Sequence, residues 1–172
     1  MRKLLIMTAL FAALAVPTVA RGEHIQATLS GYEEVPVVST VATGEFSAMI
    51  SPDDQFIDYE FSYTGLQGTV TQAHIHVAQL SVNGSIVIWL CQTATNIGPA
   101  GTPTCTPGSG SFTGTITTAN VVAATNPASQ QIAAGELAEV IAAMRAGAAY
   151  VNVHTNLSGG GEIRGQIRAS KR

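Results

Sequence analysis

Three of the four histidines lie in two segments in which apolar and polar residues alternate. His74 and His76 are two residues apart in segment 73–77, and His154 lies in segment 150–155. Alternation with abundant β-branched residues predicts strands, in which residues two apart point to the same face. Imidazole nitrogen is a preferred ligand of Zn²⁺ and Cu²⁺. If the two strands are neighbours, the sequence therefore predicts a mononuclear metal site made of three histidines.

A second interpretation gives these histidines a purely structural role. Tyr150, Asn152 and Thr155 share the second segment and can hydrogen-bond to imidazole rings, which would satisfy a polar patch between strands. Groups of the same kind also orient imidazoles that bind a metal. Both interpretations therefore stay open at the level of the sequence.

Glu162 is the candidate for a further role at this site. Glu162 and Arg164 share one face of the last predicted strand, so we expect them to form an ion pair rather than a catalytic pair. Glu162 is also a candidate fourth ligand of the metal, or a group that orients one of the ligands.

A His-X-His strand in a β-sandwich is similar to that of copper–zinc superoxide dismutase, and this similarity is an analogy only. A dismutase needs more histidines and an aspartate for its two-metal site, whereas His24 is the only histidine left over here. The sequence contains no Gly-X-Ser-X-Gly motif, phosphate-binding loop or dinucleotide fingerprint. Catalysis is therefore the alternative rather than the leading hypothesis.

Residues 1–20 have the features of a secretory signal peptide. Arg2 and Lys3 form a positive start, residues 4–16 are an apolar run, and small residues at 18–20 fit a cleavage site near Ala20. The apolar run is shorter than the roughly 20 residues that a membrane-spanning helix needs. We therefore expect export to the periplasm or the extracellular space, with one mature domain over residues 21–172.

The net charge of the mature chain limits the classes of partner that it can bind. The full sequence has a net charge of −3 from 8 basic and 11 acidic residues, and removal of two basic residues with the signal gives 6 − 11 = −5. An acidic chain has no electrostatic footprint for nucleic acid. No second apolar run is long enough to cross a bilayer after signal removal. The expected partner is an extracellular or periplasmic protein or a metal ion.

Cys91 and Cys105 are the only two cysteines, and they lie fourteen positions apart. In an oxidising compartment such a pair is expected to form a disulfide, which for a loop of this length contributes about 3 kcal/mol in the chain-entropy estimate. The alternative, a pair of metal ligands, matches no known zinc-site spacing.

The alternation of residues predicts an antiparallel, all-β sandwich of immunoglobulin-like or superoxide-dismutase-like type with one short helix. Predicted strands cover 26–29, 43–50, 57–63, 73–77, 85–91, 111–117, 150–155 and 162–168. The helix is predicted at about 136–146, from apolar residues at helical spacing and a glycine that fits its C-terminal cap. Segment 85–91 is apolar on both faces and is therefore expected in the middle of the sandwich.

Three motifs in order give the chain a resemblance to a known family. Segments 29–36, 73–76 and 150–155, the last continued by 161–167, are similar to the start, centre and end of the chordin-type (CHRD) domain. The resemblance covers about residues 26–168 and implies a β-sandwich in exported proteins. It implies little about chemistry, because the biochemical role of the family is poorly defined.

Taken together, the sequence favours an exported, non-enzymatic CHRD-domain binding module that holds a Cu or Zn ion through His74, His76 and His154. Two alternatives remain: a copper- or zinc-dependent oxidoreductase, and a purely structural or adhesive extracellular domain. The first predicts redox turnover that depends on His154. The second predicts that histidine substitutions alter folding without altering the affinity for any ligand.

Overall fold

The alternating segments form strands at the positions that the sequence predicts. The computed structural model describes residues 22–127 and 130–169, so the predicted signal peptide lies outside the described residues. The strands are β1 (Glu23–Ser30), β2 (Thr43–Ile50), β3 (Ile57–Thr64), β4 (Val70–Val77), β5 (Ser85–Cys91), β6 (Gly110–Ile116), β7 (Ala149–Thr155), β8 (Ile163–Gln166) and β9 (Arg168–Ala169). One α-helix, α1 (Leu137–Arg145), and two short 3₁₀ turns, η1 (Gly31–Glu33) and η2 (Thr118–Asn120), complete the described elements.

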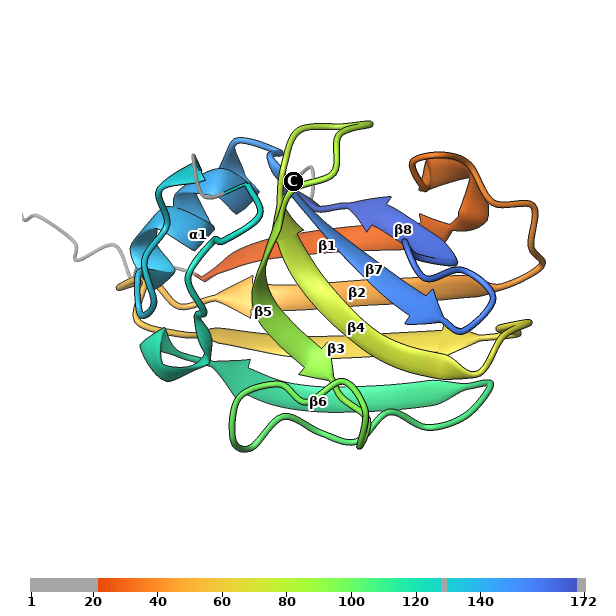
Figure 1. The fold of residues 1–172 in the computed structure, drawn as a ribbon. Coiled ribbons are helices and arrows are strands. Elements are labelled where there is room, and N and C mark those ends of the chain that lie inside the picture. The colour runs from red at the N-terminus through yellow and green to blue at the C-terminus, as the bar shows by residue number, and fades with distance from the viewer. Residues whose placement is uncertain (1–21, 128–129, 170–172) are drawn as a thin grey trace, which may run out of the picture.

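The strands form two layers of antiparallel sheet that are joined along one side. Their order is β5-β4-β7-β8-β1-β2-β3-β6, with β9 paired to β1 outside this path. Strands β5, β4, β7 and β8 lie in one layer, and β1, β2, β3 and β6 lie behind them (Figure 1). The layers connect where Ser30 at the end of β1 pairs with Arg164 in β8. The predicted antiparallel sandwich with one short helix is confirmed.

The core lies between the two layers and contains the inward side chains of the alternating strands together with the apolar face of α1. Ten of these side chains are exposed by 1% or less: Ile25, Leu29, Phe46, Ile50, Ile57, Phe61, Ile75, Val151, Val153 and Ile163. Full burial of a side chain of this size contributes about 1.5–3 kcal/mol. The core therefore fixes the register of each strand, because a slip by one residue would turn every apolar side chain outward.

Strand β5 is covered on both faces, but it lies at the end of the strand order rather than in its middle. Its outer edge is met by the segment after η2, where Val121 forms an isolated bridge with Ile88 and the Val122 N–H donates to the Val87 carbonyl. The apolar pattern of β5 correctly predicted that it is covered. It could not predict that an irregular segment, rather than another strand, lies along one edge.

The predicted disulfide is present between Cys91 at the end of β5 and Cys105. Both cysteines are buried, with exposures of 0% and 6%. The disulfide therefore anchors the irregular segment between them to the layer that contains the histidines.

Helix α1 returns the chain from β6 to the layer that contains β4. Its apolar face, formed by Leu137, Val140, Ile141 and Met144, is buried, and the helix packs across one end of the sandwich (Figure 1). Gly147 follows the helix at φ +67°, a conformation that glycine adopts without a steric penalty. The chain then enters β7 beside β4, which is the arrangement that the histidine site requires. Within the described ranges, the structure contains no helix long and apolar enough to cross a membrane.

Candidate metal centre

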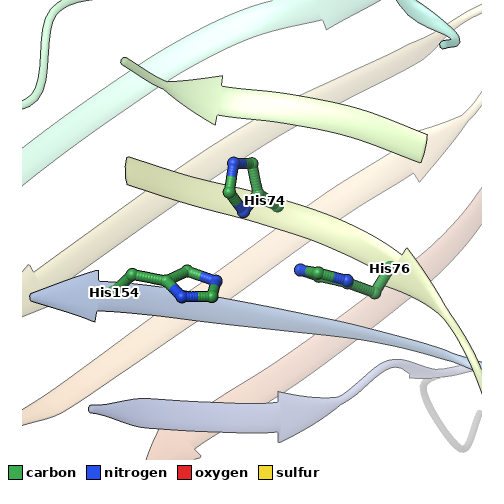
Figure 2. A group of neighbouring side chains, drawn as sticks. All are labelled: His74, His76 and His154. Atoms are coloured by element: carbon green, nitrogen blue, oxygen red, sulfur yellow. The ribbon is translucent and has the colours of Figure 1, made fainter. Parts of the chain in front are cut away.

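The antiparallel pairing of β4 with β7 brings the three predicted histidines together. His74 lies opposite Asn152, and His76 lies opposite Tyr150. His154 lies two positions beyond Asn152 on the same strand, so it points to the same face as these four side chains. This face is turned away from the apolar core. The three imidazoles point toward one another across the two strands (Figure 2).

The three rings are close enough to share one ion. Ring centroids are 5.4 Å apart for His74 and His76, 5.1 Å for His74 and His154, and 6.1 Å for His76 and His154. One nitrogen from each ring can be chosen such that all three lie within 4.8 Å of one another. The exposed fractions of the three residues are 0%, 6% and 7% in sequence order, so the cluster is closed to bulk solvent.

Two of the rings are oriented by backbone carbonyls. His76 Nδ1 lies 2.9 Å from the Gly84 carbonyl oxygen, and His154 Nδ1 lies 2.9 Å from that of Gly159. A carbonyl oxygen only accepts, so His76 carries its proton on Nδ1 and keeps the Nε2 lone pair. His154 has a second oxygen, Asn152 Oδ1, at 3.1 Å from its Nε2. This arrangement, in which one ring nitrogen donates to a carbonyl, also holds metal-binding histidines in place. His76 Nε2 has no hydrogen-bond partner in the part of the chain that the structure describes.

His74 is the most enclosed of the three and is positioned by packing. Its ring contacts Trp89 edge-to-face at a centroid distance of 4.3 Å. In the described part of the molecule neither ring nitrogen has a hydrogen-bond partner. One of these nitrogens points toward the space between His76 and His154, and the other points toward β5 (Figure 2).

Burial keeps all three imidazoles neutral. Loss of solvent lowers the pKa of His74 to about 2, and repulsion by His154 and His76 acts in the same direction. Burial lowers the pKa of His76 to about 4 against the opposing effect of its hydrogen bond to Gly84. The pKa of His154 is also lowered by burial. Neutral imidazole is the form that binds a metal ion, so the cluster is ready to act as a ligand set at neutral pH.

The cluster belongs to a larger group of buried polar side chains on the outward face of β4, β7 and β8, called here the outer polar layer. Its members are His74, His76, Tyr150, Asn152, His154, Arg164 and Gln166, and each is exposed by 7% or less. Loops 78–84 and 156–162 supply hydrogen-bond partners from outside. Loop 31–42 is joined to loop 78–84 by the bond from Asn83 Nδ2 to the Val35 carbonyl. A polar face that would otherwise meet solvent is therefore enclosed.

Aromatic stacking links the histidines to Arg164. The rings of His76 and Tyr150 are stacked with centroids 4.7 Å apart and planes within 5°. The guanidinium carbon of Arg164 lies 3.4 Å from the Tyr150 ring centroid, a cation–π geometry. Arg164 also donates to Asn83 Oδ1 and to the Val82 carbonyl. The arginine therefore ties loop 78–84 to the strands that carry the histidines.

Glu34 is the buried carboxyl group of this region, and the sequence interpretation did not single it out. Its exposed fraction is 4%, and Oε1 has no hydrogen-bond partner in the described ranges. Burial raises the pKa of Glu34 to about 7, although the charge of Arg164 and hydrogen bonds from Val35 and Asn152 oppose the rise. Its position in a segment between two strands gave no pattern that could have indicated burial.

Glu162 does not pair with Arg164, so the expected ion pair is wrong. Its carboxylate accepts hydrogen bonds from the Thr40 and Thr155 hydroxyls and from the Gln67 and Gly68 backbone N–H groups. Burial raises the pKa of this carboxyl group, but the four hydrogen bonds outweigh that effect and leave the pKa below its usual value. Since these bonds occupy both oxygens, Glu162 links three segments of the chain. It is not a member of the group of close ligand atoms.

The remaining candidates lie elsewhere. His24 is in β1, where its Nε2 is 2.9 Å from Ser47 Oγ, and it does not belong to the three-histidine cluster. Cys91 and Cys105 are bonded to each other and leave no thiolate for a metal. The candidate ligands in the described residues are therefore imidazole nitrogens, which suit borderline ions such as Zn²⁺ and Cu²⁺.

Comparison with known proteins gives one match. The family model of the CHRD domain matches residues 25–167, which is most of the chain. No curated protein and no solved structure matched the chain.

Proposed function

The chain belongs to the CHRD domain family, and we propose that it is a non-enzymatic binding module that holds one transition-metal ion through His74, His76 and His154. The single observation that carries this proposal is the convergence of three buried, neutral imidazoles, of which His74 and His76 have ring nitrogens without a protein partner in the described residues. Zn²⁺ and Cu²⁺ are the ions that such a ligand set suits.

Buried polar atoms without hydrogen-bond partners destabilise the folded state. An unsatisfied buried donor or acceptor costs about 1–3 kcal/mol. Both nitrogens of His74 and the Nε2 atom of His76 belong to this class in the described part of the chain. A purely structural cluster would leave that cost uncompensated, whereas an ion bound to His76 Nε2 and to one nitrogen of His74 offsets the part that these two atoms contribute.

The closed surroundings favour binding over catalysis. A redox enzyme needs a path for its substrate to the ion, but the exposed fractions of the three histidines are 0%, 6% and 7%. The disulfide supports a location in an oxidising compartment. We therefore place the module outside the cytoplasm, in accordance with the predicted signal peptide.

The proposal is tested by titrating the metal-free purified protein with Zn²⁺ and Cu²⁺ in a calorimeter. We expect one ion per chain. His76→Phe keeps a flat ring for the contact with Tyr150 but removes the Nε2 ligand. It should weaken binding by more than about 100-fold, because loss of a group that only orients a ligand already costs 10- to 100-fold.

His24→Phe is the matched control, because it removes the one histidine outside the cluster. It should bind the ion as the wild-type protein does. Equal binding by the wild-type protein and both variants, or no binding by any of them, would overturn the proposal and leave a structural or adhesive domain. Redox turnover by the copper-loaded protein that is lost in His154→Ala would favour the oxidoreductase alternative.

A further inference from the structure

We propose that Asn152 Oδ1 is the fourth ligand of the three-histidine site, so that the site is a four-coordinate N₃O centre selective for Zn²⁺ over Cu⁺. This inference rests on the proposed function. It assigns to Asn152 the role of fourth ligand for which the sequence suggested Glu162.

Asn152 occupies the centre of the cluster. It lies directly across the β4–β7 pair from His74 and two positions before His154 on the same strand. Side chains directly opposite one another in an antiparallel pair have Cβ atoms about 4.5–5.5 Å apart. The residue is exposed by 2%, and its Oδ1 lies 3.1 Å from His154 Nε2.

The orientation of the Asn152 amide follows from its neighbours. Nδ2 is on the side of the Gly160 carbonyl, to which it donates at 3.5 Å. Nδ2 and the Glu34 carboxyl group both border the Cβ position of Gly161. A carbonyl oxygen only accepts, so the amide directs Nδ2 toward Gly160. Oδ1 must then face the imidazoles.

This orientation creates a conflict that a proton cannot resolve. His154 has an acceptor at each ring nitrogen, the Gly159 carbonyl at Nδ1 and Asn152 Oδ1 at Nε2. A neutral imidazole carries one N–H and can donate to only one of them. Whichever nitrogen is protonated, the other directs a lone pair at an oxygen lone pair. A cation bound by both atoms removes the repulsion.

The other two imidazole rings also direct a nitrogen toward the cluster. His76 donates through Nδ1 to Gly84, so its Nε2 presents a lone pair to the cluster. His74 presents one nitrogen to the same space (Figure 2). One nitrogen from each ring and the amide oxygen of Asn152 therefore face the same space.

The distances suit a small divalent ion. Zn²⁺ binds nitrogen and oxygen ligands at about 2.0–2.2 Å in tetrahedral geometry, which places two ligand atoms about 3.3 Å apart. The 3.1 Å between Asn152 Oδ1 and His154 Nε2 already matches this spacing. The histidine nitrogens, which lie within 4.8 Å of one another, must close by at most about 1.5 Å, shared among three side chains.

The fourth ligand sets the choice of ion. Zn²⁺ in proteins is almost always four-coordinate, and an oxygen ligand suits it. Cu⁺ is a softer, monovalent ion that three nitrogens satisfy, and it gains little from an amide oxygen. Removal of Oδ1 should therefore weaken Zn²⁺ binding and leave Cu⁺ binding nearly unchanged.

The test is Asn152→Leu, which keeps a side chain of similar size and removes the amide. Competition titrations with a chromophoric chelator give the affinities for Zn²⁺ and, under anaerobic conditions, for Cu⁺. We expect a loss of at least about 10-fold for Zn²⁺ and a change of less than threefold for Cu⁺. A residue that merely positioned His154 would affect both ions equally.

Asn156→Leu is the matched control. Asn156 lies four residues further along and accepts a hydrogen bond from the Thr69 N–H at 2.7 Å, so its replacement removes a comparable bond outside the cluster. It should leave both affinities unchanged. If Asn152→Leu does not fold, the ¹³Cγ resonance of Asn152 in the wild-type protein serves instead, and it should shift with Zn²⁺ much more than with Cu⁺.

The outcomes separate this inference from the proposed function. If the wild-type protein binds both ions and Asn152→Leu weakens both equally or neither, the role of Asn152 is overturned and the three-histidine site stands. An equal ¹³Cγ shift with the two ions overturns it in the same way. If the wild-type protein binds neither ion, both proposals fail.

Discussion

The outward faces of the two layers differ although their sequences alternate in the same way. In β2 and β3 the outward side chains are exposed or half-buried, with Glu45 and Glu60 among the exposed ones, and the inward side chains are buried. In β7 all seven residues are buried, including the polar side chains of Tyr150, Asn152 and His154. One outward face meets water and the other meets loops.

This difference shows which polar groups of the molecule are buried away from water. An exposed carboxylate or hydroxyl on β2 or β3 is solvated and needs no protein partner. A polar side chain in the outer polar layer loses its hydration and must find a partner in the protein or in a ligand. The atoms of that layer that find none include the imidazole nitrogens of the candidate site.

The largest effect of burying the outward face of β4 and β7 should be a loss of stability at acidic pH. The ordinary histidine pKa is 6.5, and burial lowers the pKa to about 2 for His74 and about 4 for His76, and lowers that of His154. Below pH 6.5 the unfolded chain therefore binds up to three protons that the folded chain does not bind. The free energy of unfolding falls as the pH is lowered. Glu34, with a pKa raised to about 7, acts oppositely by taking up one proton in the folded state.

His74 and His76 account for two protons and Glu34 offsets one, so the net difference is about one proton, worth about 1.4 kcal/mol per pH unit or about 2 kcal/mol between pH 6.5 and 5. The lowered pKa of His154 adds to this difference. Denaturant unfolding of the metal-free protein across this range measures it. His76→Phe should lower the slope by about 1.4 kcal/mol per pH unit, the contribution of one proton. A free energy of unfolding that is flat between pH 6.5 and 5 would show that the histidines are not buried as neutral rings.

Metal binding should stabilise the folded state by the next largest amount. An ion at 100 times its dissociation constant adds about 2.7 kcal/mol if it binds the folded state alone. For a domain of this size the corresponding rise in melting temperature is about 5–10 °C. Thermal unfolding with Zn²⁺ and with a chelator measures this rise. An equal rise in His76→Phe would place the ion outside the three-histidine cluster.

Gly161→Ala should disturb the packing of loop 156–162 against the outer polar layer. Gly161 has φ +130°, and a Cβ atom there would collide with the Glu34 carboxylate and with Asn152 Nδ2. We expect a loss of about 1–3 kcal/mol in the free energy of unfolding, and weaker Zn²⁺ binding. Gly160→Ala is the control, because no atom lies within 4 Å of its Cβ position. Equal effects of the two substitutions would argue against close packing around Asn152.

The smallest effect is expected on the exposed face. Glu60 lies on β3 with its side chain in solvent, so Glu60→Ala should change the free energy of unfolding by no more than about 0.5 kcal/mol. Urea titration measures this change. A loss above 1 kcal/mol would mean that the outward face of β2 and β3 is also covered, and the contrast between the layers would disappear.

Much of the fold follows from local patterns. Alternation located the strands and assigned Ile75, Val151 and the histidines to opposite faces, and the helix was predicted at 136–146 against an observed Leu137–Arg145. The pairing of β4 with β7 did not follow, because these strands are separated by β5, β6 and α1 along the chain. Their adjacency depends on the path of the whole chain, so the sequence predicted three convergent imidazoles only if the strands were neighbours.

The surroundings of the site were the least predictable part. Alternation indicates which way a side chain points, but not whether a loop covers it. The buried Glu34 and the central position of Asn152 depend on loops 31–42 and 156–162, whose course is set by contacts distant in sequence. The expected Glu162–Arg164 ion pair failed for the same reason, since loops supply other partners to both residues.

X-ray absorption at the metal edge of the Zn²⁺-loaded protein tests the central claim most directly, because it reports the ligands of the ion itself. We expect a first shell of nitrogen and oxygen atoms at about 2.0–2.2 Å with the outer-shell scattering of three imidazoles. His76→Phe should abolish this signature. A first shell without imidazole scattering, or one unchanged in His76→Phe, would contradict the assignment of His74, His76 and His154 as a metal site.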